Sequence, residues 1–345
     1  MAATVSGCRG RGGVPAAMLL LGLALGLVLG GPAAAGRVVG TPYALSAAHP
    51  PGTAFAGVRL LGTIDIPSTA VDGVGIAGLS GLAWDADDGV LYALSDRGRI
   101  FHLRPRFAGE RLVGVELLHG YHLRGADGRI LPRWRVDSEG LALEHGRNGV
   151  RGDAQLILSF EGQPRVDVYR PDARWLAGYS LPGELWNADY YASANEALES
   201  VARVAPYGVI TAPERPVWGE SAAEVPLVAA TGETWTYPLG PETNAALVDL
   251  CATADDGVLF LERSWVSPFH PRVSTLRRVA ALPEPGARLA PETVARFSSA
   301  RGWRVDNFEG LARYEGNRYF MVSDDNERAS QRTLLVHFEL LEPAP

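Results

Sequence analysis

The stretch Glu139-Gly140-Leu141-Ala142 is one of five similar stretches that recur along this chain of 345 residues. Each copy has a small or acidic residue, then a small or apolar residue, then Leu, Val or Cys, and ends in Ala. The five alanines follow one another at intervals of 59, 60, 50 and 60 residues, close to the length of a propeller blade. The other copies are Ser80-Gly81-Leu82-Ala83, Glu199-Ser200-Val201-Ala202, Asp249-Leu250-Cys251-Ala252 and Glu309-Gly310-Leu311-Ala312.

Every copy continues with a turn and then a second apolar run that ends in polar residues. Asp87-Asp88-Gly89 and Asp255-Asp256-Gly257 are such turns, since Asp-Gly between apolar runs is a strong hairpin signal. The 40 Gly and 24 Pro of the chain suit many short strands joined by turns. The pattern predicts an all-β propeller, in which antiparallel four-stranded blades surround a channel.

The first 35 residues are typical of a signal peptide rather than of a folded domain. Arg9 and Arg11 precede an apolar run over residues 18–29, and Ala33-Ala34-Ala35 has the small residues of a cleavage site. The run is too short to span a bilayer, although an uncleaved N-terminal anchor stays an alternative. We therefore expect a periplasmic or secreted protein without stable membrane insertion, with a linker at 36–56 and the propeller domain at 57–345.

The composition excludes some kinds of catalytic chemistry and some classes of partner. All 32 basic residues are Arg, which indicates a bacterial source and excludes a lysine nucleophile and a P-loop. Without residues 1–35, 30 Arg face 39 acidic residues, and this net charge of −9 argues against nucleic acids and membrane surfaces as partners. Cys251 is the only cysteine beyond residue 35, so we expect it in the core and expect no internal disulfide.

Seven stretches of the chain carry a family resemblance. They are Gly78-Leu79-Ser80-Gly81-Leu82, Tyr92-Ala93-Leu94-Ser95-Asp96-Arg97-Gly98, Asp137-Ser138-Glu139-Gly140-Leu141-Ala142, Asn195-Glu196-Ala197-Leu198-Glu199-Ser200, Leu261-Glu262-Arg263, Asp306-Asn307-Phe308-Glu309-Gly310-Leu311-Ala312 and Ser323-Asp324-Asp325-Asn326. Together they resemble the phytase-like domain family, described as "esterase-like activity of phytase". The resemblance implies an exported propeller of six blades that hydrolyses phosphoesters or esters. Since only five copies of the repeat are visible, the sixth blade is expected to pair Val58–Ile66 with Leu334–Leu340.

Acidic residues occupy the same repeat position in four of the five copies. Equivalent positions of a propeller converge on its axis, so these acids are expected to form a ring of metal ligands. Oxygen ligands of this kind suit Ca²⁺, which could polarise a phosphoryl or ester oxygen. Alternatively, the acids are separated, solvated or bonded to backbone amides. The expected metal ligands are Glu139, Glu199, Asp249 and Glu309, and Glu309, Glu139 and Glu199 are also the expected catalytic acids.

Arginines follow the second apolar runs of several repeats. A guanidinium binds phosphate oxygens bidentately, so we expect Arg97, Arg215 and Arg263, with Arg165, to bind the substrate. Equally, these arginines could form ion pairs that link neighbouring blades. Among the seven histidines, only His270 is a candidate catalytic acid or base.

Two classes of function remain open from the sequence. The first is a monomeric, calcium-dependent hydrolase of small phosphoesters or related esters, or a lactonase-type propeller. The second is a non-catalytic propeller that binds a ligand or a protein through the same face. No G-x-S-x-G stretch occurs, which makes a serine hydrolase of that type a poor fit.

Overall fold

The computed structural model describes residues 36–193, 195–219, 221 and 223–341. These residues form strands and three 3₁₀ turns (Arg133–Arg135, Ala188–Tyr190 and Ser299–Arg301) but no α-helix. No helix in this part of the chain is long and apolar enough to cross a membrane. The predicted all-β class is therefore confirmed for the described residues, and the predicted signal peptide at 1–35 lies outside them.

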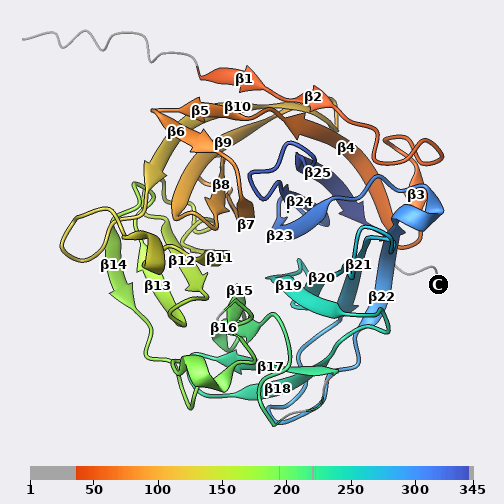
Figure 1. Cartoon of the computed structure of the whole chain (residues 1–345). Helices are drawn as coiled ribbons and strands as arrows, with labels where there is room; N and C mark the ends of the chain where they lie inside the picture. Colours follow the sequence, from red (N-terminus) through yellow and green to blue (C-terminus); the bar gives the residue numbers. More distant parts are fainter. Residues whose placement is uncertain (1–35, 194, 220, 222, 342–345) are drawn as a thin grey trace, which may run out of the picture. The chain divides into compact units, whose positions relative to one another are not determined.

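Five antiparallel sheets surround a central channel as the blades of a propeller (Figure 1). Blade 1 contains β7 (Leu79–Asp85), β8 (Val90–Ser95), β9 (Arg99–Ala108), β10 (Arg111–His122) and β1 (Arg37–Val39). Blade 2 contains β11 (Ser138–Glu144), β12 (Gln155–Phe160), β13 (Arg165–Tyr169) and β14 (Trp175–Gly178). Blade 3 contains β15 (Leu198–Val204), β16 (Gly208–Pro213), β17 (Glu224–Ala229) and β18 (Thr234–Pro238).

Blades 4 and 5 complete the ring. Blade 4 contains β19 (Ala245–Ala252), β20 (Val258–Ser264), β21 (Val273–Val279) and β22 (Glu292–Ser298). Blade 5 contains β23 (Asn307–Arg313), β24 (Arg318–Asp324), β25 (Thr333–Leu340), β4 (Val58–Ile66), β2 (Thr41–Pro42) and β3 (Ala54–Phe55). The repeat motif lies on the innermost strands β7, β11, β15, β19 and β23, each of which contacts the next around the ring.

The prediction of six blades is wrong, although the strand pairing on which it rested is confirmed. Val58–Ile66 does pair with Thr333–Leu340 in an antiparallel register. Because β25 also pairs with β24 along its other edge, the two strands complete blade 5 instead of forming a separate sheet. The two ends of the propeller sequence therefore close the ring within one blade.

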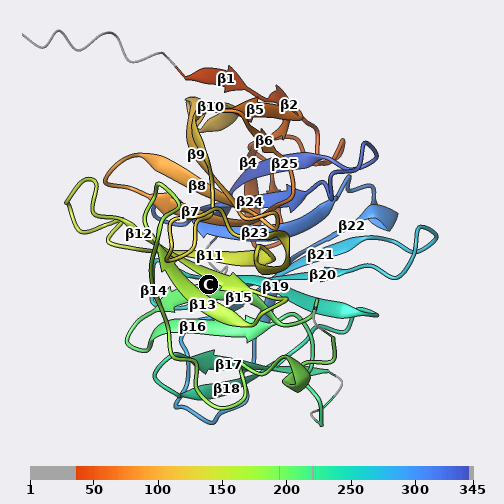
Figure 2. The same ribbon diagram turned by 60° about the vertical axis from the view of Figure 1, so that its left-hand side comes forward.

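The segment 36–56, expected as a linker, contributes strands to two blades. Arg37–Val39 extends the outer edge of blade 1 along β10, and Thr41–Pro42 pairs with β4 in blade 5. This segment thus bridges the two blades at which the chain closes the ring. In both views, β1 and β2 lie on the opposite side of the ring from β17 and β18 of blade 3 (Figures 1 and 2). A hairpin of β5 (Thr69–Val71) and β6 (Val74–Ile76) leads into blade 1.

Five hydrophobic clusters hold the ring together, one between each pair of neighbouring blades. The Leu-Ala pair of the repeat explains this arrangement, because successive side chains of a strand point to opposite faces. Leu141 packs against blade 1, and Ala142 packs against blade 3. In blade 4, Leu250 packs toward blade 3 and Cys251 toward blade 5, so Cys251 occupies the position of the repeat alanine.

The innermost strands approach one another so closely that glycine is required beside the channel. A Cβ atom on Gly140 would lie 2.6 Å from the Val201 nitrogen of the next innermost strand. On Gly310 it would lie 2.8 Å from the Ser80 carbonyl oxygen. A glycine inside a strand often marks such a close backbone approach, and the glycines of the repeat have this role.

This close approach predicts the effect of Gly140→Ala on stability. The added methyl group meets backbone atoms that cannot move independently, so we expect a loss of about 1–3 kcal/mol in the free energy of unfolding. Gly75→Ala is the matched control, because a Cβ atom there meets nothing within 4 Å. Urea unfolding of the two variants measures the difference. Equal midpoints for the two variants would contradict the proposed role of Gly140.

Candidate functional site

Each innermost strand carries a β-bulge near its start, and this bulge sets the first group of site residues. Bulges redirect side chains and often lie beside functional sites. In blade 5 the pairing skips from Phe308 to Gly310, which leaves Glu309 in the bulge. The corresponding residues of blades 1 to 4 are Ser80, Glu139, Glu199 and Val248.

A second group of residues follows from the same registers at the end of each second strand. In blade 3, Leu198 pairs with Pro213, and Glu214 comes next. In blade 4, Leu247 pairs with Glu262, and the next residue is Arg263. The corresponding residues of blades 1, 2 and 5 are Asp96, Glu161 and Asp324. Seven of the ten positions in the two groups thus carry carboxyl groups, and one carries an arginine.

These side chains converge at one end of the channel. Carboxylate oxygens of Glu161, Glu199 and Glu214 lie within 4.8 Å of one another, and all three residues are buried. The Arg263 guanidinium lies 2.9 Å from Glu214 Oε1 and 2.9 Å from Glu309 Oε1. We call Asp96, Glu139, Glu161, Glu199, Glu214, Glu309 and Asp324, together with Arg263, the acid cluster.

Burial and mutual repulsion raise the pKa values of most of these acids. Burial is the main cause for Glu309, whose pKa rises to about 8 although Arg263 opposes the rise. The pKa of Asp324 rises to about 7 and that of Asp96 to about 6, again chiefly through burial. The pKa values of Glu139, Glu161 and Glu199 lie well above the ordinary value, through burial and then through neighbouring carboxylates. Near neutral pH, the cluster therefore favours bound protons or a bound cation.

The donor set fits a hard divalent cation. Seven carboxyl groups face one guanidinium, so the cluster keeps an excess of negative charge when it ionises. Its donors are oxygens, which Ca²⁺ and Mg²⁺ prefer, and it has none of the sulfur or imidazole ligands typical of zinc sites. Glu161, Glu199 and Glu214 are the residues that could hold such an ion.

The structure brings three of the four expected metal ligands into the acid cluster and leaves Asp249 outside it. The register places Val248 at the position of Glu309, and Asp249 at the position of the repeat glycines. The Asp249 carboxylate accepts hydrogen bonds from the backbone nitrogens of Leu250 and Leu311, at 2.8 and 2.6 Å. The alignment of the fourth repeat copy by sequence was therefore wrong by one residue.

Sequence reasoning missed the carboxylates of the second group. Asp96, Glu161, Glu214 and Asp324 each follow an apolar run at the same place in the repeat. That recurrence was the available signal.

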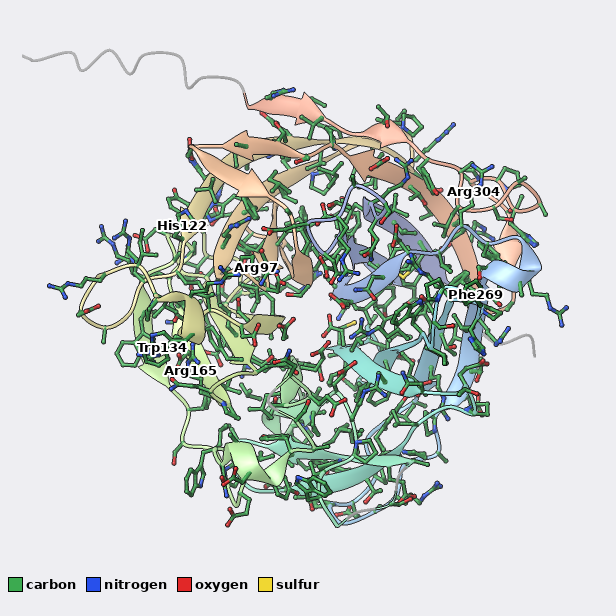
Figure 3. The ribbon with its side chains drawn as sticks, viewed as in Figure 1. Arg97, His122, Trp134, Arg165, Phe269 and Arg304 are labelled. Carbon is green, nitrogen blue, oxygen red and sulfur yellow. The ribbon has the colours of Figure 1, made fainter. Side chains whose placement is uncertain are left out.

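The expected substrate-binding arginines have different environments. Arg263 is fully engaged within the acid cluster, so it acts there as a counter-ion. Arg215 Nε lies 3.2 Å from Glu196 and 3.7 Å from Glu214. Arg97 Nε lies 3.7 Å from Asp96, so both arginines contact the edge of the cluster. Arg165 binds Asp167 and the Arg135 carbonyl oxygen, and it lies farther from the channel than Arg97 (Figure 3). His270 is exposed, and its Nδ1 lies 2.8 Å from Ser267 Oγ.

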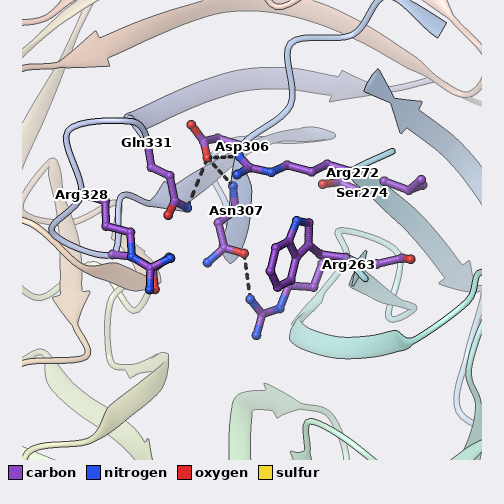
Figure 4. A pocket seen from close by; sticks show the side chains of 11 residues that line it. Arg263, Arg272, Ser274, Asp306, Asn307, Arg328 and Gln331 are labelled. Atoms are coloured by element: carbon purple, nitrogen blue, oxygen red, sulfur yellow. Dashed lines mark hydrogen bonds and ion pairs between the residues drawn. The ribbon is translucent and has the colours of Figure 1, made fainter. Parts of the chain in front are cut away.

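A cavity of about 250 Å³ adjoins the acid cluster between blades 4 and 5, and Arg263 belongs to both. Arg328 and Gln331 reach it from one side, and Arg272 and Ser274 from the other (Figure 4). The loops at this end also carry the exposed Trp and Phe side chains of the described residues. These are Trp134, Trp186, Trp218, Trp265 and Phe269.

The raised pKa values predict that stability falls as the pH rises when no divalent cation is present. Between the ordinary carboxyl pKa and the raised values, the folded state binds more protons than the unfolded state, so deprotonation favours unfolding. We expect a higher melting temperature at pH 5.5 than at pH 8.0 in EDTA. Glu139→Gln, which removes one of these ionisations, should reduce the difference. A melting temperature that stays constant or rises from pH 5.5 to pH 8.0 would contradict the raised pKa values of the acid cluster.

Residues 74–327 match the family model named Phytase-like, "Esterase-like activity of phytase". No curated protein matches the sequence. A chain of the solved structure "Crystal Structure of Mitotic Checkpoint Complex" is 12% identical, with 83% of this chain and 72% of that chain covered and a TM-score of 0.36. Sqt1 of Saccharomyces cerevisiae is 8% identical, with 81% and 90% covered and a TM-score of 0.38.

Those two similarities are too weak to carry an argument, whereas the family match is extensive. The matched residues make up well over half of the chain and include strands of all five blades. They also include the whole acid cluster and the cavity residue Arg272. The chain therefore belongs to the phytase-like family.

Proposed function

We propose that this protein is a calcium-dependent hydrolase of small phosphoesters or related esters, with its active site at the acid cluster. The observation that carries the proposal is the gathering of seven carboxyl groups, six of them buried, with one arginine in a chain of the phytase-like family. We propose further that the protein is exported to the periplasm or secreted, and that it acts there as a monomer. Its proposed partner is a small-molecule substrate rather than a nucleic acid or a membrane.

The residues of the cluster suit distinct roles in such a reaction. Glu161, Glu199 and Glu214 would hold Ca²⁺, which supplies Lewis-acid polarisation of the phosphoryl or ester oxygen. Arg263 fixes the positions of Glu214 and Glu309 through its two ion pairs. Such positioning matters, because catalytic groups act efficiently only when they are held in the productive geometry.

Glu309 is the proposed general acid. Its pKa of about 8 keeps it protonated at pH 7, and a second hydrogen bond, from Asn307 Nδ2 at 2.7 Å, orients its carboxyl group. A protonated Glu309 can donate its proton to the leaving-group oxygen as the ester bond breaks. Glu139 is the proposed acceptor of the proton that the attacking water loses, in the ionised form that Ca²⁺ binding to the cluster would favour.

The first test concerns calcium. At pH 7.5, Ca²⁺ should raise the melting temperature of the wild-type protein, because binding at a hundredfold excess over Kd contributes about 2.7 kcal/mol. Glu199→Gln should abolish this rise together with the hydrolysis of p-nitrophenyl phosphate. Asp249→Asn is the matched control, since its carboxylate binds backbone amides outside the cluster and the calcium-dependent rise should remain. If Ca²⁺ does not change the melting temperature of the wild-type protein, the proposal is contradicted and a non-catalytic binding propeller is favoured.

The second test concerns the proton donor. Glu309→Gln should lower kcat for phenyl phosphate by about 10²–10⁴-fold, while the calcium-dependent rise in melting temperature remains. The loss should be smaller for p-nitrophenyl phosphate, because its leaving group needs less protonation. The wild-type rate should also fall above pH 8, where Glu309 deprotonates. Equal losses for the two substrates would exclude Glu309 as the general acid.

A further inference from the structure

The cavity between blades 4 and 5 has the electrostatic character of an anion site. Arg263, Arg272 and Arg328 line it, and Asp306 is its only acidic lining residue among those described. Arg272 Nη1 and the Arg332 backbone nitrogen donate to Asp306, at 2.8 and 2.9 Å, so the charge of that carboxylate is already compensated. Because Arg263 is itself paired with Glu214 and Glu309, the positive charge that remains unpaired in the cavity is that of Arg328.

Arg328 differs from the other two arginines of the cavity. Arg263 is held by Glu214, Glu309 and Asn307, and Arg272 is held by Asp306. The Arg328 side chain makes no hydrogen bond or ion pair with any other residue of the described chain. It approaches the cavity from the loop between β24 and β25, alongside Gln331 (Figure 4). Its donors are thus available to a ligand.

The cavity also offers an aromatic wall. Trp265, in the loop between β20 and β21, lines the cavity and keeps 45% of its surface exposed. An exposed indole provides a flat apolar surface on which an unsaturated ring can pack. The amide groups of Asn307 and Gln331 add polar contacts from the opposite blade. The unpaired guanidinium, the amide groups and the indole together complement a ligand in which an oxyanion is attached to a flat organic group.

We propose that this cavity binds an organic phosphate, with the phosphate on Arg328 and Arg272 and the organic group on Trp265. The inference rests on the proposed function, since it names the class of substrate that would reach the acid cluster past Arg263. A guanidinium that has no other partner is well suited to a phosphate, because it presents paired donors that match two phosphate oxygens. Arg328 is thus the main determinant of affinity, and Trp265 distinguishes organic phosphates from inorganic phosphate.

Calorimetric titration with phenyl phosphate in EDTA tests this site without turnover. Wild-type protein should bind phenyl phosphate, and Arg328→Ala should weaken binding at least tenfold. Trp265→Leu should weaken binding of phenyl phosphate more than binding of inorganic phosphate. Arg304→Ala, at an exposed arginine of the loop between β22 and β23 (Figure 3), is the matched control and should bind as wild type. Melting temperatures of all variants confirm that each is folded.

The outcomes separate this site from the proposed hydrolase. If Arg328-dependent binding occurs but no calcium-dependent hydrolysis is found, the phosphate site is supported and the hydrolase is wrong. If hydrolysis occurs but Arg328→Ala changes neither binding nor KM, the phosphate site is wrong and the hydrolase remains. The proposed site would also be wrong if wild-type protein does not bind phenyl phosphate, or if Arg304→Ala weakens this binding as much as Arg328→Ala does.

Discussion

The close packing of the five innermost strands is the constraint on which the rest of this structure depends. At Gly140 and Gly310 the backbone of the next innermost strand lies too close for a Cβ atom, so neighbouring backbones are in contact around the channel. The bulge that precedes each of these positions then places Glu139 and Glu309 at the same level of the ring. Acids that are far apart in the sequence therefore share one small buried volume, and their pKa values are raised chiefly by that burial.

Blade 4 breaks the symmetry of this ring. It has Val248 in the bulge, where blades 2, 3 and 5 carry acids, and Arg263 at the end of the second strand, where all four other blades carry acids. Arg263 consequently binds acids from the blades on both of its sides, Glu214 of blade 3 and Glu309 of blade 5. The same guanidinium forms part of the wall of the cavity toward blade 5. The least acidic blade is thus where a substrate anion could approach without strong repulsion.

Much of this architecture could be predicted from the sequence, because the repeat encodes local geometry. The Leu-Ala pair indicates which side chains of each innermost strand pack against the neighbouring blades. The pairing of β4 with β25 follows from apolar runs at both ends of the propeller sequence. The number of blades could not be predicted, since sequence does not reveal whether that pair forms its own sheet or joins blade 5. Asp249 was misplaced because Ala252 was aligned with the repeat alanines, whereas Cys251 occupies that position in blade 4.

A crystal structure of the protein grown in Ca²⁺, with an anomalous difference map, tests the central claim most directly. The account predicts one strong peak coordinated by carboxylate oxygens of Glu161, Glu199 and Glu214. Hard oxygen ligands at about 2.3–2.6 Å would identify the ion as calcium. A cluster that stays free of metal at millimolar Ca²⁺, with its carboxyl groups bonded only to one another and to Arg263, would contradict it.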